Sequence, residues 1–161
     1  MDDLVRGAQR GDPLAMDALV RALAPRVGRL CGSIALQHGD DALQETLIAV
    51  LRHIGALRDP AALWGWVRRI AVHESVRVAQ RASRVVPVED VEQTGTSDIE
   101  SSVDVRAVLA DLPVDQRAIL VLRDLEGMSE EEAARLLDAP VGTVKSRLHR
   151  ARAAFRERWV S

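Results

Sequence analysis

One apolar pattern near the start of the chain constrains the fold more than any other feature of the sequence. Large apolar residues recur there at spacings of three and four, and this spacing places them on one face of an α-helix. The residues of this stripe are Met16, Leu19, Leu23, Val27, Leu30 and Ile34. Because Pro25 falls inside the stripe, we expect a kink or a break of the helix at that position.

The helical spacing continues through the rest of the first block, which covers residues 1–84. A second helix is predicted for "DALQETLIAVLRHI", with Asp40 or Asp41 as its N-terminal cap. Gly55 and the segment "LRDP" end this helix, and "AALWGWVRRIAVHESVRVAQR" forms a further one. The sequence therefore predicts an all-α fold for the block.

A change of composition separates this block from the remainder of the chain. The segment from Val85 to Val105 contains six acidic residues and no basic one, together with turn-forming residues. A structureless loop of this length is unusual inside a compact domain. We therefore predict a flexible acidic linker over residues 85–101, which joins two small helical domains, 1–84 and 102–161. The alternative is a loop within one compact domain.

The second domain ends in a helix-turn-helix pattern. Ser129 and Glu132 have the spacing of a capping box, which marks the start of a short acidic helix. Asp138 and Ala139 suit a tight turn, since aspartate tolerates the left-handed backbone conformation. A final helix begins near Pro140, and two short helices joined by such a turn form a helix-turn-helix.

The final helix has an apolar face and a basic face. Between Pro140 and the end of this helix the chain has six basic residues and one acid, although its formal net charge is only -2. On a helical wheel with Val144 at zero, a set of apolar residues falls within about 60 degrees of it. These core-facing residues are Leu148, Ala151, Phe155 and Trp159.

Two interpretations of the basic face are open. It can be the solvated side of an amphipathic helix, or it can read the major groove of DNA. In the second interpretation Arg147 or Arg150 pairs with a guanine edge and Lys145 neutralises a phosphate. The second is favoured because the preceding helix is acidic, so that basic charge is confined to the last helix.

Several classes of function are excluded by what the sequence lacks. A single cysteine, Cys31, excludes a disulfide framework and a thiolate zinc cluster, and its apolar neighbours indicate a buried structural thiol. The sequence shows no Gly-rich phosphate loop, metal-ligand spacing or nucleophile elbow, so we expect no catalytic residue, metal or cofactor. Without a signal-peptide pattern or an apolar run of about 20 residues, we expect a cytoplasmic protein without membrane insertion.

Two stretches resemble a known family of bacterial transcription proteins. The stretch "LPVDQRAILVLRDLEGMSEEEAARLLDAPVGTVKSRLHRARAAF" resembles region 4 of sigma-70-family factors of the extracytoplasmic function (ECF) group. The first block resembles region 2 of these factors through "DDALQETLIAVL" and "WGWVRRIA". Both resemblances together cover nearly the whole chain. They imply an alternative sigma factor that binds core RNA polymerase and directs it to promoters.

The resemblance also implies roles for three sets of residues. The last helix would read the minus-thirty-five promoter element through Thr143, Lys145, Ser146, Arg147, His149 and Arg150. The first domain would read and open the minus-ten element with Arg58, Trp64, Arg68, Arg69, His73 and Arg77. It would dock on core polymerase through Asp41, Gln44, Glu45 and Ile48. The implied partners are the β′ and β subunits, promoter DNA and an anti-sigma factor.

We expect different environments for the two tryptophans of the first block. Trp66 matches a position that is usually aromatic in the resembled family, and we expect it in the core. Trp64 points elsewhere on the same helix, and we expect it to be the exposed aromatic that can stack on an unpaired base.

The runner-up interpretation is a stand-alone helix-turn-helix regulator that binds DNA without polymerase. A helical bundle for protein interactions comes third, and an enzyme is the least favoured. The helix with "DDALQE" distinguishes a sigma factor from a stand-alone regulator, because a stand-alone regulator has no need of this helix.

Overall fold

The computed structural model describes residues 1–84 and 105–160, and every regular element in these ranges is helical. The chain divides into two compact units, Met1–Val78 and Ala79–Ser161. The division falls within one long helix, whereas the sequence placed the end of the first domain at residue 84. The predicted linker, residues 85–101, lies outside the described residues. Within those residues the all-α prediction is confirmed.

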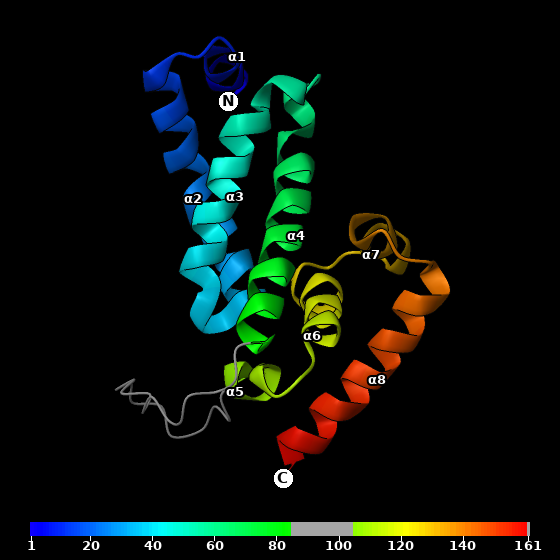
Figure 1. Cartoon of the computed structure of the whole chain (residues 1–161). Coiled ribbons are helices and arrows are strands. Elements are labelled where there is room, and N and C mark those ends of the chain that lie inside the picture. The colour runs from blue at the N-terminus through cyan, green and yellow to red at the C-terminus, as the bar shows by residue number, and fades with distance from the viewer. Residues whose placement is uncertain (85–104, 161) are drawn as a thin grey trace. The chain divides into compact units, whose positions relative to one another are not determined.

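The first unit is built from long helices (Figure 1). They are α1 (Asp2–Gln9), α2 (Pro13–Ala35), α3 (Gly39–His53) and α4 (Leu63–Arg84), with the short turns η1 (Leu36–His38), η2 (Ile54–Ala56) and η3 (Pro60–Ala62) between them. The Asp12 carboxylate caps α2 by accepting a hydrogen bond from the Leu14 amide at 3.0 Å. The Gln9 side chain ties α1 to η2, since its Nε2 donates to the carbonyl of Ile54 at 3.0 Å.

The apolar stripe of α2 forms the core of this unit. Leu19, Val27 and Ile34 are fully buried, and α2 packs along α3. The helix continues through Pro25 without a break, so that part of the prediction is wrong. Pro25 removes one backbone hydrogen bond, but buried apolar residues on both sides of it keep the helix continuous.

The turn between α2 and α3 depends on a close approach of two glycines. A Cβ atom at Gly39 would lie 2.8 Å from the Cα atom of Gly32, so only glycine fits there. The predicted cap at Asp40 or Asp41 is wrong, because α3 begins at Gly39 and has no side-chain cap. Both aspartates lie in the first turn instead, where their charge favours the positive end of the helix dipole.

A small polar group is buried between the helices of the first unit. Cys31 is fully buried, and its Sγ lies 3.8 Å from the Oγ1 of Thr46, which donates to the Ala42 carbonyl at 2.7 Å. Burial raises the pKa of the Cys31 thiol. The cysteine is therefore a protonated structural thiol, as the sequence indicated.

The second unit contains α5 (Val105–Ala110), α6 (Val114–Leu120), the π-helical turn η4 (Val121–Leu125), α7 (Glu130–Leu137) and α8 (Val141–Val160). Gly127 has a φ of 68° and ends the α6–η4 segment, as its position in the sequence predicted. The buried guanidinium of Arg117 donates to the carbonyls of Leu109 and Leu112 at 3.1 and 3.3 Å. This arginine therefore satisfies carbonyls at the end of α5, and its burial lowers its pKa.

Candidate nucleic-acid interface

Local features fix both ends of α7, with a capping box at its start and a left-handed residue at its end. The Ser129 amide donates to the Glu132 carboxylate at 2.8 Å, and the Glu132 amide donates to the Ser129 hydroxyl at 3.1 Å. Asp138 has φ 52° and ψ 41°, the left-handed conformation that the sequence predicted. The capping box and the turn are therefore both confirmed, and they orient α8 relative to α7.

The apolar face of α8 anchors its N-terminal half. Val144, Leu148 and Ala151 are buried, as the helical wheel predicted. Phe155 is only half-buried and Trp159 is 41% exposed, so the prediction of a core position is wrong for these two. The wheel assigns a face, but burial also needs a neighbouring element. Near Phe155 the neighbour is α5, which has only 6 residues.

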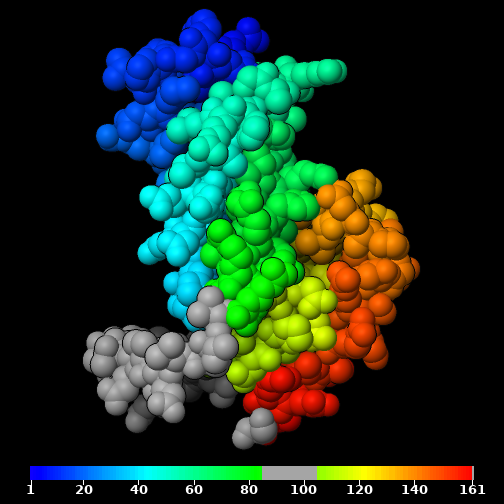
Figure 2. All heavy atoms as spheres, viewed as in Figure 1, coloured from blue at the N-terminus to red at the C-terminus, as the bar shows by residue number. Residues whose placement is uncertain are grey.

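The opposite face of the N-terminal half of α8 is a shallow depression on the surface of the second unit. Figure 2 shows the side chains of α8, coloured orange to red, at the surface. The depression is lined by Gly142, Lys145, Ser146, His149 and Arg150. All five residues are exposed. Four of the six residues predicted to read DNA therefore lie together on one accessible surface, which we call the outer face.

The other two predicted residues lie beside the outer face. Arg147 is turned toward α6, where its Nε lies 3.5 Å from a carboxylate oxygen of Asp115. The Thr143 side chain is half-buried, and its carbonyl accepts a hydrogen bond from the Ser146 hydroxyl at 3.1 Å. Of the two arginines proposed for base reading, Arg150 is therefore the one on the outer face.

Acidic residues of other helices pair with several basic residues of α8. Arg152 binds Asp124 of η4 through two hydrogen bonds, at 2.7 and 3.3 Å, and this contact raises the pKa of Arg152. Lys145 lies 3.7 Å from Glu130 of α7. Sequence reasoning missed these pairs, because their acids lie on other helices; Asp124, for example, stands 28 positions before Arg152. Within the described part of the chain, no ion pair reaches Arg150.

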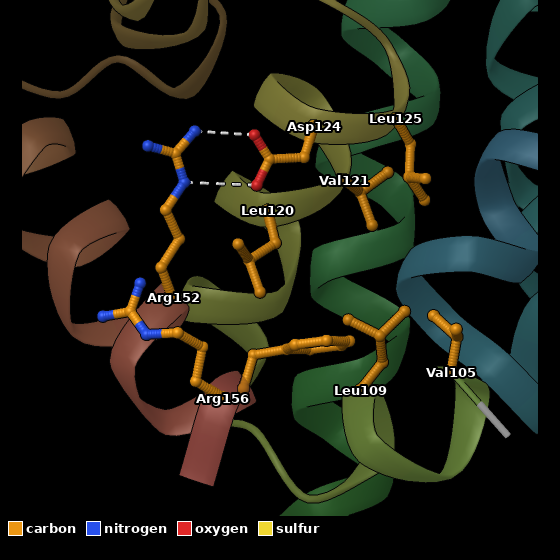
Figure 3. A pocket seen from close by; sticks show the side chains of 9 residues that line it. Val105, Leu109, Leu120, Val121, Asp124, Leu125, Arg152 and Arg156 are labelled. Carbon is orange, nitrogen blue, oxygen red and sulfur yellow. Dashed lines mark hydrogen bonds and ion pairs between the residues drawn. The ribbon is translucent and has the colours of Figure 1, made fainter. Parts of the chain in front are cut away.

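A second surface feature of this unit is an apolar groove of about 280 Å³ (Figure 3). Its apolar walls are Val105, Leu109, Leu120, Val121, Leu125 and Phe155. Arg152, Arg156 and Asp124 line it as well, and in Figure 3 the two arginines lie together on the α8 side. Leu125 is an exposed large apolar residue. The sequence did not predict this groove, because it is formed by four elements of the second unit.

In the first unit, the residues predicted to bind polymerase form one stripe on α3. Asp41, Gln44, Glu45 and Ile48 follow the three- and four-residue spacing of a single helix face. Asp41, Gln44 and Ile48 are exposed and Glu45 is partly exposed. Ile48 is 42% exposed, although isoleucine is among the residue types that proteins most often bury.

The residues predicted to contact the minus-ten element fall into two groups. Arg69, His73 and Arg77 are exposed along one side of α4, and Arg58 is exposed between η2 and η3. The remaining two, Trp64 and Arg68, are half-buried on another face of α4. The structure therefore does not bring the six residues together on one surface.

Trp64 is not the exposed aromatic that the sequence predicted. The guanidinium carbon of Arg26, on α2, lies 3.6 Å from the centre of the Trp64 ring. This cation–π contact covers one face of the indole. Trp66 is also half-buried rather than part of the closed core. A base could therefore stack on the covered face of Trp64 only after Arg26 moved.

Arg77 joins the two surfaces predicted for the first unit. Its guanidinium forms an ion pair with Glu74 of the same helix and lies 3.8 Å from Glu45 of α3. Glu45 belongs to the predicted polymerase stripe, whereas Arg77 belongs to the predicted minus-ten set. The two surfaces therefore adjoin at the Arg77–Glu45 pair.

No helix in the described ranges is long and apolar enough to cross a membrane. In the same ranges no group of three or more histidine, cysteine, aspartate or glutamate side chains is arranged to hold a metal ion.

Two family models match the chain in consecutive segments. The model "Sigma-70 region 2" matches residues 19–85, and the model "Sigma-70, region 4" matches residues 102–155. The two matches together span more than half of the chain, in the order in which the two domains were predicted.

Curated relatives and solved structures agree with these matches. The chain is 36% identical to the ECF RNA polymerase sigma factor SigM of Mycobacterium tuberculosis, over 94% of this chain and 80% of the relative. It is 33% identical to the ECF RNA polymerase sigma-E factor of Escherichia coli, over 94% of this chain and 90% of the relative.

Two similar solved structures contain a second protein. One is the sigma factor RpoE in complex with the anti-sigma factor NepR from Bartonella quintana, with a TM-score of 0.65 and 25% identity over 88% of this chain and 94% of that chain. The other is CnrH in complex with the cytosolic domain of CnrY, with a TM-score of 0.61 and 25% identity over 96% of this chain and 93% of that chain.

Proposed function

Because the chain belongs to the sigma-70 family, in its ECF group, we propose the function of an alternative sigma factor for it. It binds core RNA polymerase and promoter DNA and directs promoter-specific initiation of transcription. The observation that carries this function is the presence of region 2 and region 4 in order on one chain. A stand-alone regulator is not favoured, since it would not need region 2. No catalytic role is proposed, and the place of action is the cytoplasm, where polymerase works.

The minus-thirty-five element is read by the outer face of α8. Arg150 lies there without an ion pair to another described residue, so its guanidinium is available for two hydrogen bonds to a guanine edge. Lys145, Ser146 and His149 lie beside it and supply phosphate contacts and smaller polar contacts. Thr143 and Arg147 support this surface from its edges.

The first unit docks on the β′ subunit through the stripe Asp41, Gln44, Glu45 and Ile48. This stripe offers one exposed apolar side chain for the contact and acidic and polar groups for its rim. The minus-ten element contacts the exposed side of α4 with Arg69, His73 and Arg77, and Arg58 joins from the loop before it.

The apolar groove of the second unit serves a protein partner, for which we propose a helix of an anti-sigma factor. One similar structure holds the anti-sigma factor NepR, and another holds the cytosolic domain of CnrY. A groove with apolar walls and Arg156 in its lining accepts the apolar face of an amphipathic helix that carries an acidic residue along its edge. The β subunit is the other proposed partner of this unit.

Run-off transcription with purified core polymerase over a library of promoters tests the function. We expect transcripts only from a subset of promoters that share an upstream and a downstream element. A chain that neither binds core polymerase nor yields any transcript would contradict the proposal.

Replacement of Arg150 by alanine is expected to relax base preference in the upstream element. Loss of a bidentate guanine contact costs about 1–3 kcal/mol, which is a loss of about 5- to 150-fold in affinity for the preferred sequence. Binding of the holoenzyme to promoter variants by fluorescence anisotropy measures this effect. The matched control is Arg106→Ala, at an exposed position of α5 and outside α8. Unchanged affinity and preference in Arg150→Ala would show that the outer face does not read bases.

Replacement of Lys145 by alanine is expected to act differently from Arg150→Ala. A lysine that neutralises one phosphate contributes to all sequences alike, so the loss should be uniform across promoter variants. The slope of the logarithm of affinity against the logarithm of salt concentration should fall in magnitude by about one. A change of sequence preference in this variant would contradict the phosphate role.

A further inference from the structure

We infer that Glu130 competes with DNA phosphate for Lys145 and thereby limits how tightly the outer face binds DNA. The inference rests on the proposed role of α8 in promoter binding. It assigns a function to a residue outside the recognition helix, at the start of α7.

The geometry places one carboxylate beside the one lysine of the chain. The Nζ atom of Lys145 lies 3.7 Å from a carboxylate oxygen of Glu130, and the two side chains are 60% and 28% exposed. Glu130 is the first residue of α7 and follows the capping residue Ser129, so its backbone is held by the capping box. The turn at Asp138 brings the start of α8 back to it.

The neighbouring glutamates have other environments. Glu132 accepts the hydrogen bond of the capping box, so its carboxylate is committed to the Ser129 amide. Glu131 is exposed, and in the described ranges no ion pair joins it to another residue. Glu130 is therefore the acidic residue of this turn whose carboxylate is placed beside Lys145.

When a DNA phosphate binds Lys145, the ion pair between Lys145 and Glu130 is weakened. An ammonium group has a single compact charge, so a phosphate that takes Lys145 leaves Glu130 with a weaker partner. The Glu130 carboxylate then lies close to another negative charge, which opposes binding. Exposed ion pairs of this kind contribute little, so the competition should weaken DNA binding by about two- to fivefold at low salt.

Glu130→Gln is therefore expected to tighten DNA binding. In the full chain bound to core polymerase, we expect about two- to fivefold higher affinity for a promoter duplex and for an unrelated duplex alike. Because salt screens exposed charges, the gain should shrink between 50 mM and 300 mM salt. The matched control is Glu131→Gln, which removes the same charge from the same helical turn and should give a smaller gain.

A double-mutant cycle tests whether Glu130 acts through Lys145. When Lys145 is replaced by glutamine, Glu130→Gln should no longer raise the affinity more than Glu131→Gln does. Equal gains from the two glutamate variants in the parent chain, or an undiminished gain in the Lys145→Gln background, would overturn the inference.

Arg150→Ala, measured in the same assay, tests the DNA-binding role of α8 separately from the competition by Glu130. If Arg150→Ala weakens promoter binding while the two glutamate variants behave alike, only the competition by Glu130 is wrong. If no substitution on the outer face affects binding, the proposed function of α8 fails, and the inference fails with it.

Discussion

Replacement of Ile48 by arginine is expected to weaken binding to core polymerase strongly without unfolding the chain. Ile48 is 42% exposed at the end of the acidic stripe on α3, so a longer polar side chain fits there without entering the core. An apolar side chain at the centre of an interface can contribute 2 kcal/mol or more, and a charge in its place must also be desolvated. We expect the dissociation constant for core polymerase to rise by at least about 30-fold.

The control for this prediction is another exposed apolar residue of the same unit. Leu14, on α2, is 82% exposed and lies outside the predicted stripe. Leu14→Arg should bind core polymerase like the parent chain, and both variants should have the parent's midpoint of urea denaturation. Full binding by Ile48→Arg would show that the α3 stripe is not the docking surface.

Replacement of Leu148 by alanine is expected to destabilise the second unit and to remove recognition of the upstream element. Leu148 is 3% exposed and, with Val144 and Ala151, anchors α8. A buried leucine replaced by alanine costs about 2–5 kcal/mol, which is a large share of the stability of a small domain. Urea denaturation of the chain, together with hydrogen exchange of α7 and α8, measures this loss.

The same variant should keep its binding to core polymerase through the first unit, because none of the residues of the α3 stripe is changed. Glu157→Ala, on an exposed position of α8, is the matched control and should alter stability by less than about 0.5 kcal/mol. A loss of under 1 kcal/mol in Leu148→Ala would mean that α8 is not held by this contact.

Local features were predictable because each depends on residues close together in the chain. The capping box needs only Ser129 and Glu132, and the turn needs only the tolerance of Asp138 for positive φ. The buried face of α8 around Val144 follows from helical periodicity, which neighbouring helices in the same unit then cover. The exceptions were positions such as Pro25, where packing outweighs the local preference of a residue.

The sequence alone thus determined the helices, the helix-turn-helix and the face of α8 that carries the residues proposed to bind DNA. The tertiary structure alone decided the partner of each basic side chain: Asp115 for Arg147, Asp124 for Arg152 and Glu130 for Lys145. It also decided that Arg26 covers Trp64 and that an apolar groove stays open beside Phe155. Helical periodicity predicts which face of one helix carries the apolar or basic side chains. The partner of a side chain on that face depends on which other helices pack there and on their position along the helix axis.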